Sequence, residues 1–220
     1  AGGRMERGDA GMTPAKRALD LAVALLLIAI LALPFGLLLL WLLWREGRPV
    51  FYVAERMKAP GQPFALWKLR TMRMADPGAN SGVSGGDKAS RITATGRLLR
   101  RTRLDEVPQL WNVLKGDMSF VGPRPPLREY VERFPHIYAR VLQSRPGITG
   151  LASLHFHRHE EWLLAQCSTP EETDAVYVRR CIPRKARLDL IYQKRRSICL
   201  DLSLMIETAA KVLPGRRGKR

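Results

Sequence analysis

Cysteine is scarce in this 220-residue chain, and signatures of nucleic-acid readers are absent from it. The three cysteines, Cys167, Cys181 and Cys199, are an odd number and form no CxxC pair. This pattern argues against a disulfide framework or a zinc finger, and it fits a reducing cytoplasm. We expect the cysteines to be small buried hydrophobic residues. Because no helix-turn-helix, zinc-finger or RNA-binding signature is present, the sequence gives no support to sequence-specific binding of nucleic acid.

Acidic residues are also few, and the chain is strongly basic as a result. It has 37 lysines and arginines against 20 aspartates and glutamates, a formal net charge of +17 and a pI near 10.7. A balance this basic implies polyanionic partners, which are nucleic acid, an anionic membrane surface or phosphorylated substrates. The length predicts one domain with a modest core.

A long hydrophobic run, residues 18–44, carries a single charge at Asp20. With about 27 residues it exceeds the roughly 20 that span a bilayer, and it is too long for a secretory signal. Two structures remain open: a tilted spanning helix, or a re-entrant hairpin broken near Pro34. The hairpin is favoured because each half, about 22 Å long, is too short for a core of about 30 Å. Both flanks are also basic, which places both ends on the cytoplasmic side.

The stretch around Asp105 and Glu106 is the most informative part of the sequence. Four arginines precede the acid pair: Arg97, Arg100, Arg101 and Arg103. Apolar residues then recur at the spacing of one helix face: Val107, Leu110, Trp111 and Leu114. Since Pro108 is tolerated only in a first helical turn, the acids are predicted at a helix N-terminus. An isolated acid pair there would be a cap, but arginine forks and a Gly-Pro-Arg-Pro-Pro turn suit a diphosphate site with an ionised carboxylate.

The run LDEVPQLWNVLKGDMSFVGPRP resembles the signature of the bacterial sugar transferases, the monotopic phosphoglycosyl transferases. The resemblance covers residues 16–212 and includes KRALD, RPVFY, FALWKLRTM and RPGITG. It implies a re-entrant membrane helix broken at a proline. This chain has Leu33 where the family often has a serine before that proline, so the hydrogen bond of such a serine is missing.

The resemblance also implies a reaction. A sugar-1-phosphate passes from a nucleotide diphosphate sugar, usually a UDP-sugar, to undecaprenyl phosphate, as the first membrane step of exopolysaccharide or glycoconjugate synthesis. Asp105 is then the nucleophile that forms a covalent phosphosugar intermediate, Glu106 is its partner, and both hold Mg²⁺. The further implied contacts are Arg100, which matches a phosphate-contacting arginine, and Pro123, Arg124 and Pro125, which match a turn near the nucleotide. Arg124 is a candidate base or phosphate contact.

Residues 51–74 are predicted as a short strand or loop followed by an amphipathic segment. Lys68 and Arg70 alternate there with apolar residues. One interpretation is a membrane-surface face with cations on the headgroups, and the other is a phosphate contact. We place the surface role first and keep both residues as candidate substrate-binding residues.

The stretch LASLHFHRHEEW departs from the family pattern. His155, His157 and His159 would share one face of a strand, but no fourth zinc ligand is evident. Many relatives have an Asn-Gly-Arg-Asn-like motif here that is thought to contact substrate phosphate. The arginine of that motif falls on His157, with Arg158 adjacent, so these two residues are the candidate substitutes.

The remaining segments complete a mainly α architecture with a little β (α+β). Residues 76–95 are Gly/Ser-rich and predict a flexible loop, with a lid as one role. Residues 127–145 predict a helix interrupted at Pro135. Residues 171–220 predict a helical region whose basic belt docks on anionic headgroups. The expected organisation is a tail at 1–15, a re-entrant membrane helix at 16–46, a compact cytoplasmic catalytic domain at 47–213 and a basic tail at 214–220.

These predictions place a monotopic enzyme on the cytoplasmic face of the bacterial inner membrane. Its expected partners are the nucleotide-sugar donor, undecaprenyl phosphate and anionic lipids, without nucleic acid, and a homo-oligomer stays open. The competing class is a non-catalytic, membrane-anchored basic protein that binds nucleic acid or anionic lipid. Salt-sensitive retention of nucleic acid without donor turnover would favour that class.

Overall fold

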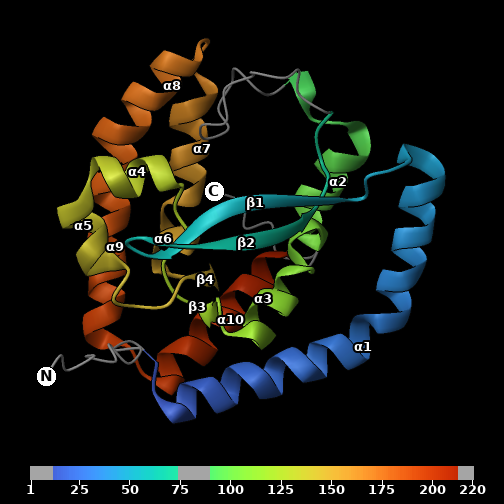
Figure 1. The fold of residues 1–220 in the computed structure, drawn as a ribbon, viewed down its shortest axis with the longest axis horizontal. Helices are drawn as coiled ribbons and strands as arrows, with labels where there is room; N and C mark the ends of the chain where they lie inside the picture. Colours follow the sequence, from blue (N-terminus) through green and yellow to red (C-terminus); the bar gives the residue numbers. More distant parts are fainter. Residues whose placement is uncertain (1–11, 74–89, 213–220) are drawn as a thin grey trace, which may run out of the picture.

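The computed structural model describes residues 12–73 and 90–212 (Figure 1). Within these residues the chain is mostly helical with a few short strands, as predicted. The helical elements are α1 (Pro14–Glu46), α2 (Ala94–Thr102), the 3₁₀ turn η2 (Leu104–Glu106), α3 (Gln109–Lys115), α4 (Arg128–Arg133), α5 (Pro135–Val141), α6 (Leu151–His155), α7 (His157–Ala165), α8 (Pro170–Val176), the π-helical turn η3 (Tyr177–Cys181), α9 (Ile182–Arg195) and α10 (Ile198–Val212). The strands are β1 (Phe51–Ala59), β2 (Gln62–Leu69), β3 (Ser119–Val121) and β4 (Gly147–Thr149). Most of the predicted N-terminal tail and flexible loop, and the basic tail at 214–220, lie outside the described residues.

Helix α1 is a single helix of 33 residues. It begins after Thr13, whose side chain accepts a hydrogen bond from the Lys16 backbone N–H at 3.2 Å, and Pro14 fits the first turn. By length and composition α1 is able to cross a membrane. Only 6% of its most apolar 18-residue window is buried inside the protein. Protein therefore leaves most of this apolar surface uncovered, which indicates membrane association.

The break predicted near Pro34 does not occur. The helical backbone continues through Pro34, and the helix instead changes direction along its length, from the lower edge of Figure 1 to its right side. Proline removes one backbone hydrogen bond and its ring clashes with the carbonyl one turn earlier, which bends a helix without having to end it. The structure thus has a continuous bent helix where the sequence predicted a two-armed hairpin, and the sidedness of its ends stays a prediction.

Strands β1 and β2 form an antiparallel hairpin that crosses the middle of the protein in Figure 1. Gly61 has a φ of +71° in the connecting turn, a conformation that favours glycine. The segment predicted as amphipathic is strand β2, so its alternation has the two-residue period of a strand. Lys68 pairs with Tyr52 in this hairpin, and the two side chains share one face.

The short strands β3 and β4 pair in parallel and fix the Gly-Pro-Arg-Pro-Pro turn. The Gly122 N–H donates to the Thr149 carbonyl at 2.9 Å, and the Gly147 N–H donates to the Pro123 carbonyl at 2.8 Å. A side chain on Gly122 would collide with the backbone carbonyl of Arg145, so only glycine permits this close approach. Arg124 is therefore carried on a backbone held from two sides.

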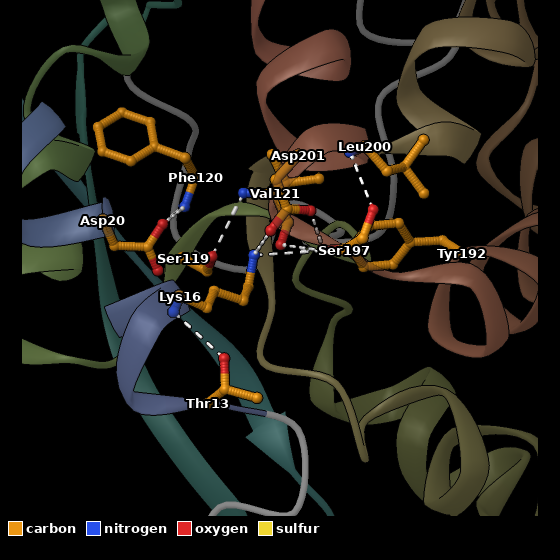
Figure 2. A network of polar contacts seen from close by, with 10 residues as sticks. All are labelled: Thr13, Lys16, Asp20, Ser119, Phe120, Val121, Tyr192, Ser197, Leu200 and Asp201. Carbon is orange, nitrogen blue, oxygen red and sulfur yellow. Dashed lines mark hydrogen bonds and ion pairs between the residues drawn. The ribbon is translucent and has the colours of Figure 1, made fainter. Parts of the chain in front are cut away.

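A buried polar network connects the start of α1 to β3, α9 and the start of α10 (Figure 2). Lys16 Nζ lies 2.6 Å from Asp201 Oδ2 and 3.2 Å from the Tyr192 hydroxyl, which in turn lies 2.6 Å from Asp201 Oδ1. The Phe120 N–H donates to Asp20 Oδ1 at 3.2 Å. We call these residues, Lys16, Asp20, Phe120, Tyr192 and Asp201, the root network. It joins α1, β3, α9 and α10.

The neighbouring Arg17 anchors α1 to a different helix. Its guanidinium donates to the carbonyls of Val113 at 2.6 Å and Leu114 at 2.9 Å, in the last turn of α3. A cation at a helix C-terminus is favourable because the last carbonyls lack intrahelical donors. The helix that follows the acid pair is thereby fixed to the membrane-associated helix.

Two sequence predictions need correction. Residues 151–165 form helices α6 and α7 in place of the predicted histidine-bearing strand, because the buried residues Ala152, Phe156 and Leu163 recur at helical spacing. Cys167 and Cys181 are buried as expected, but Cys199 is exposed on α10. The interruption predicted at Pro135 is confirmed, since α4 ends at Arg133 and α5 begins at Pro135.

Candidate active site

Asp105 and Glu106 lie in η2, the turn between α2 and α3. Arg103 ends α2 with a φ of 58°, in the left-handed region, and this residue redirects the chain into η2. Pro108 immediately precedes α3, so the acids lie just before a helix N-terminus, as predicted. Both side chains are buried, each 7% exposed. The predicted apolar face of α3 holds for Leu110, which is buried, but Trp111 is 56% exposed.

Glu106 is held by three cations. Its Oε1 lies 2.7 Å from Arg124 Nη2 and 3.4 Å from Lys68 Nζ, and its Oε2 lies 3.2 Å from Arg103 Nη1. Burial alone would raise the pKa of Glu106, but Arg124, Lys68 and Arg103 together lower it well below the usual range. Glu106 is therefore an ionised carboxylate with both oxygens engaged.

Asp105 has a different environment. Its Oδ1 is buried and has no hydrogen-bond partner among the described residues. Burial, and then the neighbouring Glu106, raise the pKa of Asp105, and this outweighs the opposite effect of Lys68 and Arg100. The sequence predicted that nearby cations would lower the pKa of this carboxyl, and in the free protein the direction is reversed. A buried oxygen without a hydrogen-bond partner is uncommon in folded proteins, and in a residue that lines a cavity it points to a functional role.

The acid pair opens into a cavity of about 1030 Å³. Among the described residues, nine basic and five acidic side chains line it. The basic ones are Arg56, Lys68, Arg70, Arg73, Arg91, Arg100, Arg103, Arg124 and Lys185. A cavity with this excess of cations is suited to a ligand with several negative charges, such as a diphosphate.

Three of the predicted cations make specific contacts at the cavity wall. Arg100 Nε donates to Thr71 Oγ1 at 2.9 Å, which fixes its guanidinium. Arg70 Nη2 donates to the Glu46 carbonyl at 2.9 Å and thereby connects β2 to the end of α1. Burial, and then Arg124, lower the pKa of Lys68 to about 8, although Glu106 and Asp105 oppose the shift. Lys68 lines the cavity, and its ammonium lies 3.4 Å from Glu106 Oε1.

The predicted turn residues divide into two groups. Pro125 and Arg124 line the cavity, whereas Pro123 is buried behind it and contributes its carbonyl to the β3–β4 pairing. Burial opposes but does not cancel the effect of Glu106, which raises the pKa of Arg124. Arg124 is thus a permanent cation aimed at the acid pair.

Of the two residues offered as substitutes for the family arginine, only His157 lines the cavity. His157 Nε2 lies 3.3 Å from Glu161 Oε1, and burial lowers the pKa of His157. Arg158 is exposed. His159 stacks on Trp162 with ring centroids 5.6 Å apart, so the histidines do not converge.

Several lining residues were not predicted as site residues. Arg56 and Arg103 line the cavity, and the sequence marks Arg103 only as part of the arginine cluster before the acid pair. Lys185 and Asp189 lie on α9, about 80 residues after the acid pair, and no local pattern marks them. The available signal for Arg56 was its place in β1, where it follows Tyr52 and Ala54 on the same strand face.

A metal site would have to draw on the substrate for part of its ligands. In the part of the chain that the structure describes, no three His, Cys, Asp or Glu side chains form a group able to hold a metal ion. Magnesium is commonly held by one or two carboxylates together with substrate phosphates and water. Since both Glu106 oxygens face cations, the Asp105 carboxyl is the group of the acid pair left to bind such an ion together with substrate phosphates, and in that sense the residues present fit it.

The chain matches the family described as bacterial sugar transferase over residues 12–215. It is 35% identical to the uncharacterized sugar transferase EpsL of Bacillus subtilis, across 90% of this chain and 87% of that protein. It is 35% identical to the UDP-glucose:undecaprenyl-phosphate glucose-1-phosphate transferase of Caulobacter vibrioides, across 90% of this chain and 69% of that protein. With the undecaprenyl-phosphate galactose phosphotransferase of Salmonella typhimurium the identity is 32%, across 90% of this chain but 40% of the relative. This chain belongs to the bacterial sugar transferase family and is a phosphoglycosyl transferase.

Proposed function

We propose that this enzyme transfers a sugar-1-phosphate from a UDP-sugar to undecaprenyl phosphate at the cytoplasmic face of the inner membrane. The names of the Caulobacter and Salmonella relatives support the lipid acceptor. The observation that carries the proposal is Asp105, a buried carboxyl with an unpartnered oxygen, in the lining of a cavity that has an excess of cations. A non-catalytic basic protein would have no need of this arrangement, and family membership favours the enzyme.

The proposed reaction has two displacements at one phosphorus. A carboxylate oxygen of Asp105 forms a bond to the phosphorus that bears the sugar, and the bond from that phosphorus to the nucleotide breaks, so UMP leaves with the electron pair. An oxygen of undecaprenyl phosphate then attacks the same phosphorus. The aspartyl oxygen leaves, the carboxylate is restored, and undecaprenyl-diphosphate sugar is formed.

The cations of the cavity prepare both displacements. Lys68, Arg100 and Arg124 neutralise the diphosphate, which otherwise repels an incoming carboxylate. Bound phosphate remains anionic and attracts these groups, while Glu106 balances Arg124 and Arg103 in the free enzyme. Asp105, together with phosphate oxygens of the donor, would hold Mg²⁺, which would supply further charge neutralisation at the diphosphate, whereas both Glu106 oxygens are occupied by cations.

The position of the site relative to α1 suits a lipid substrate. Arg70 contacts the last turn of α1 at Glu46, and Arg17 fixes α3 to its first turns. The acid pair therefore has a defined place relative to the membrane-associated helix. We propose that both ends of α1 face the cytoplasm, which single-cysteine labelling at positions 14 and 46 in a cysteine-free background would test. Labelling from opposite faces of sealed vesicles would contradict it.

The covalent intermediate is the decisive test. Purified enzyme is incubated with UDP-sugar and Mg²⁺ without lipid acceptor, and is then analysed by intact-protein and peptide mass spectrometry. We expect UMP release limited to about one equivalent and a sugar-phosphate adduct on the peptide that contains Asp105.

Two variants complete this test. Asp105→Asn should give neither burst nor adduct, whereas Glu129→Gln, which removes an exposed carboxylate from α4, should give both. Product formation in the full reaction with no protein-bound sugar phosphate at any time would overturn the proposal.

A further inference from the structure

The cavity extends beyond the acid pair into a second polar region. This region is walled by α7, the π-helical turn η3 and α9, and its polar residues are Glu160, Tyr177, Lys185 and Asp189. We call it the distal chamber. Lys185 Nζ lies 2.8 Å from Glu160 Oε1 and 3.3 Å from the Tyr177 hydroxyl. Single π-helical turns occur often at functional sites, and this one places Tyr177 on the chamber wall.

Asp189 is the residue of this chamber that lacks a partner. The residue is 7% exposed and lines the cavity, and among the described residues no hydrogen bond or ion pair reaches its carboxyl, whose oxygens are not sealed as Asp20 Oδ2 and Asp105 Oδ1 are. Burial raises the pKa of Asp189 to about 7, and the effect of nearby Lys185 is smaller. A mostly buried carboxyl without a protein partner costs stability, and its place in the cavity lining makes a hydrogen-bonding ligand the explanation that we pursue.

The distal chamber adjoins the phosphate-binding end of the cavity. Arg56 lines the same cavity, and its pKa is lowered by burial and then by Arg124, while Tyr52 and Tyr177 oppose the shift, so its guanidinium lies near residues of both regions. Glu160 likewise interacts with both Arg124 and Lys185. A ligand whose phosphates lie among Lys68, Arg100 and Arg124 would therefore extend its next group toward Asp189.

The lining indicates the chemistry of that group. Two carboxylates accept hydrogen bonds, one ammonium donates them, and a tyrosine hydroxyl is able to do both. Each hydroxyl group of a sugar both donates and accepts hydrogen bonds, so neighbouring sugar hydroxyls would pair with several of these side chains at once. A uracil ring offers one N–H donor and two carbonyl acceptors, so it matches a chamber with two carboxylates less well.

We propose that the distal chamber binds the sugar hydroxyl groups of the donor and that Asp189 determines which sugar is accepted. This inference rests on the proposed transfer of a sugar-1-phosphate. A site that hydrogen-bonds a substrate hydroxyl rejects a substrate that lacks or misplaces it, because buried polar groups are then left unpaired. The choice among epimers and deoxy sugars is accordingly expected to depend on this residue.

The test compares donors on wild-type enzyme and on Asp189→Asn. The panel contains UDP-glucose, UDP-galactose, their N-acetyl forms and a deoxy analogue, and UMP release with undecaprenyl phosphate is measured. We expect Asp189→Asn to lower kcat/KM for the best donor by about 10²-fold and to compress the ratios among donors. Inhibition by UMP and UDP, which carry no sugar, should change less than threefold.

Controls separate this inference from the proposed function and from misfolding. Glu171→Gln, an exposed change on α8, should keep the wild-type ratios. If Asp189→Asn does not fold, Glu160→Gln provides the second variant, with the same compression expected. Unchanged ratios, or an equal loss of affinity for UMP and for the sugar donor, would overturn the inference while wild-type turnover still supports the transferase. Absence of wild-type turnover on every donor would instead count against the proposed function.

Discussion

The protein buries two clusters of charged residues, and they are built differently. In the root network one ammonium, Lys16, is matched by Asp201, and both Asp201 oxygens are engaged. In the active-site cavity the cations outnumber the acids, and the cluster borders open space. The Lys16–Asp201 pair is thus matched within the protein, whereas the cavity keeps an excess of positive charge that an anionic ligand would balance.

An unpaired oxygen alone does not distinguish the two clusters. Asp20 Oδ2 in the root network has no hydrogen-bond partner among the described residues, and the same holds for Asp105 Oδ1. Of these two aspartates, only Asp105 lines the cavity. Only Asp105 also has several cations nearby, namely Lys68, Arg100 and Arg124, and none of them forms an ion pair with it. The difference shows that an oxygen without a hydrogen-bond partner indicates function only where the carboxyl also lines a cavity and has several cations nearby.

Asp105→Asn should produce the largest separation between the two clusters. We expect turnover to fall at least ~10³-fold, because the nucleophilic oxygen is lost. Since burial disfavours the ionised form of Asp105, the neutral amide should leave the free energy of unfolding unchanged or slightly higher. Steady-state UMP release and thermal unfolding of the same preparation measure both effects. A variant that is inactive because it is unfolded would weaken the comparison.

Lys16→Met should have the opposite profile. Removing one member of a buried ion pair leaves Asp201 uncompensated, and the expected loss of stability is about 3–5 kcal/mol. The folded fraction should retain its kcat. A double-mutant cycle with Asp201→Leu measures the coupling, and the double variant should recover much of the loss because neither member of the pair is left buried without the other. Additive losses would show that the pair does not act as a unit.

The pH dependence of Lys68 gives a smaller effect. With a pKa of about 8, the free enzyme loses this cation as the pH rises through that value, so kcat/KM for the donor should fall about tenfold above it. Stability should move the other way. Between about 8 and the ordinary lysine pKa of 10.5 the unfolded chain binds the extra proton, so this group makes the fold more stable as the pH rises.

Lys68→Arg serves as the control for this profile, because arginine keeps its charge throughout the range. Its alkaline limb should disappear or move to higher pH. A profile identical to that of the wild-type enzyme would assign the limb to another group.

The smallest expected effect belongs to Arg17→Gln. Loss of the two hydrogen bonds to the C-terminal carbonyls of α3 should cost about 1 kcal/mol, measured by chemical unfolding. Turnover should change little at low temperature. A large loss of turnover with unchanged stability would contradict this prediction, because it would show that Arg17 takes part in catalysis.

The sequence predicted the parts of the site that lie close together in the chain. Asp105, Glu106 and Arg100 fall within seven residues, and the turn with Arg124 follows soon after, so local pattern and resemblance were enough. Asp189 could not be predicted, because only the packing of α9 against α5, α6 and η3 brings it to the cavity. The strand predicted for the histidine stretch was wrong for another reason. Alternation over five residues fits a strand, but the buried residues Phe156 and Leu163 are seven positions apart, which is the spacing of one helix face.

The long apolar helix was the easiest element to predict and its shape the hardest. Composition alone identified residues 18–44, whereas a proline is compatible with a break, a bend or a straight helix with a local distortion. The backbone of α1 is bent and continuous. The sequence around a proline does not predict which of these three shapes forms, because the choice depends on what surrounds the helix more than on its own residues.

The contact between Lys16 and Asp201 also constrains how the protein is made. The two residues are separated by 185 positions, so the ribosome releases the helix that carries the ammonium long before it synthesises the carboxylate that receives it. During that interval the nascent chain has its lipid-facing helix but lacks the counterion at its base. This contact between α1 and α10 thus forms only after α10 has been synthesised, and a chain that ends before α10 would lack the buried ion pair at the base of α1.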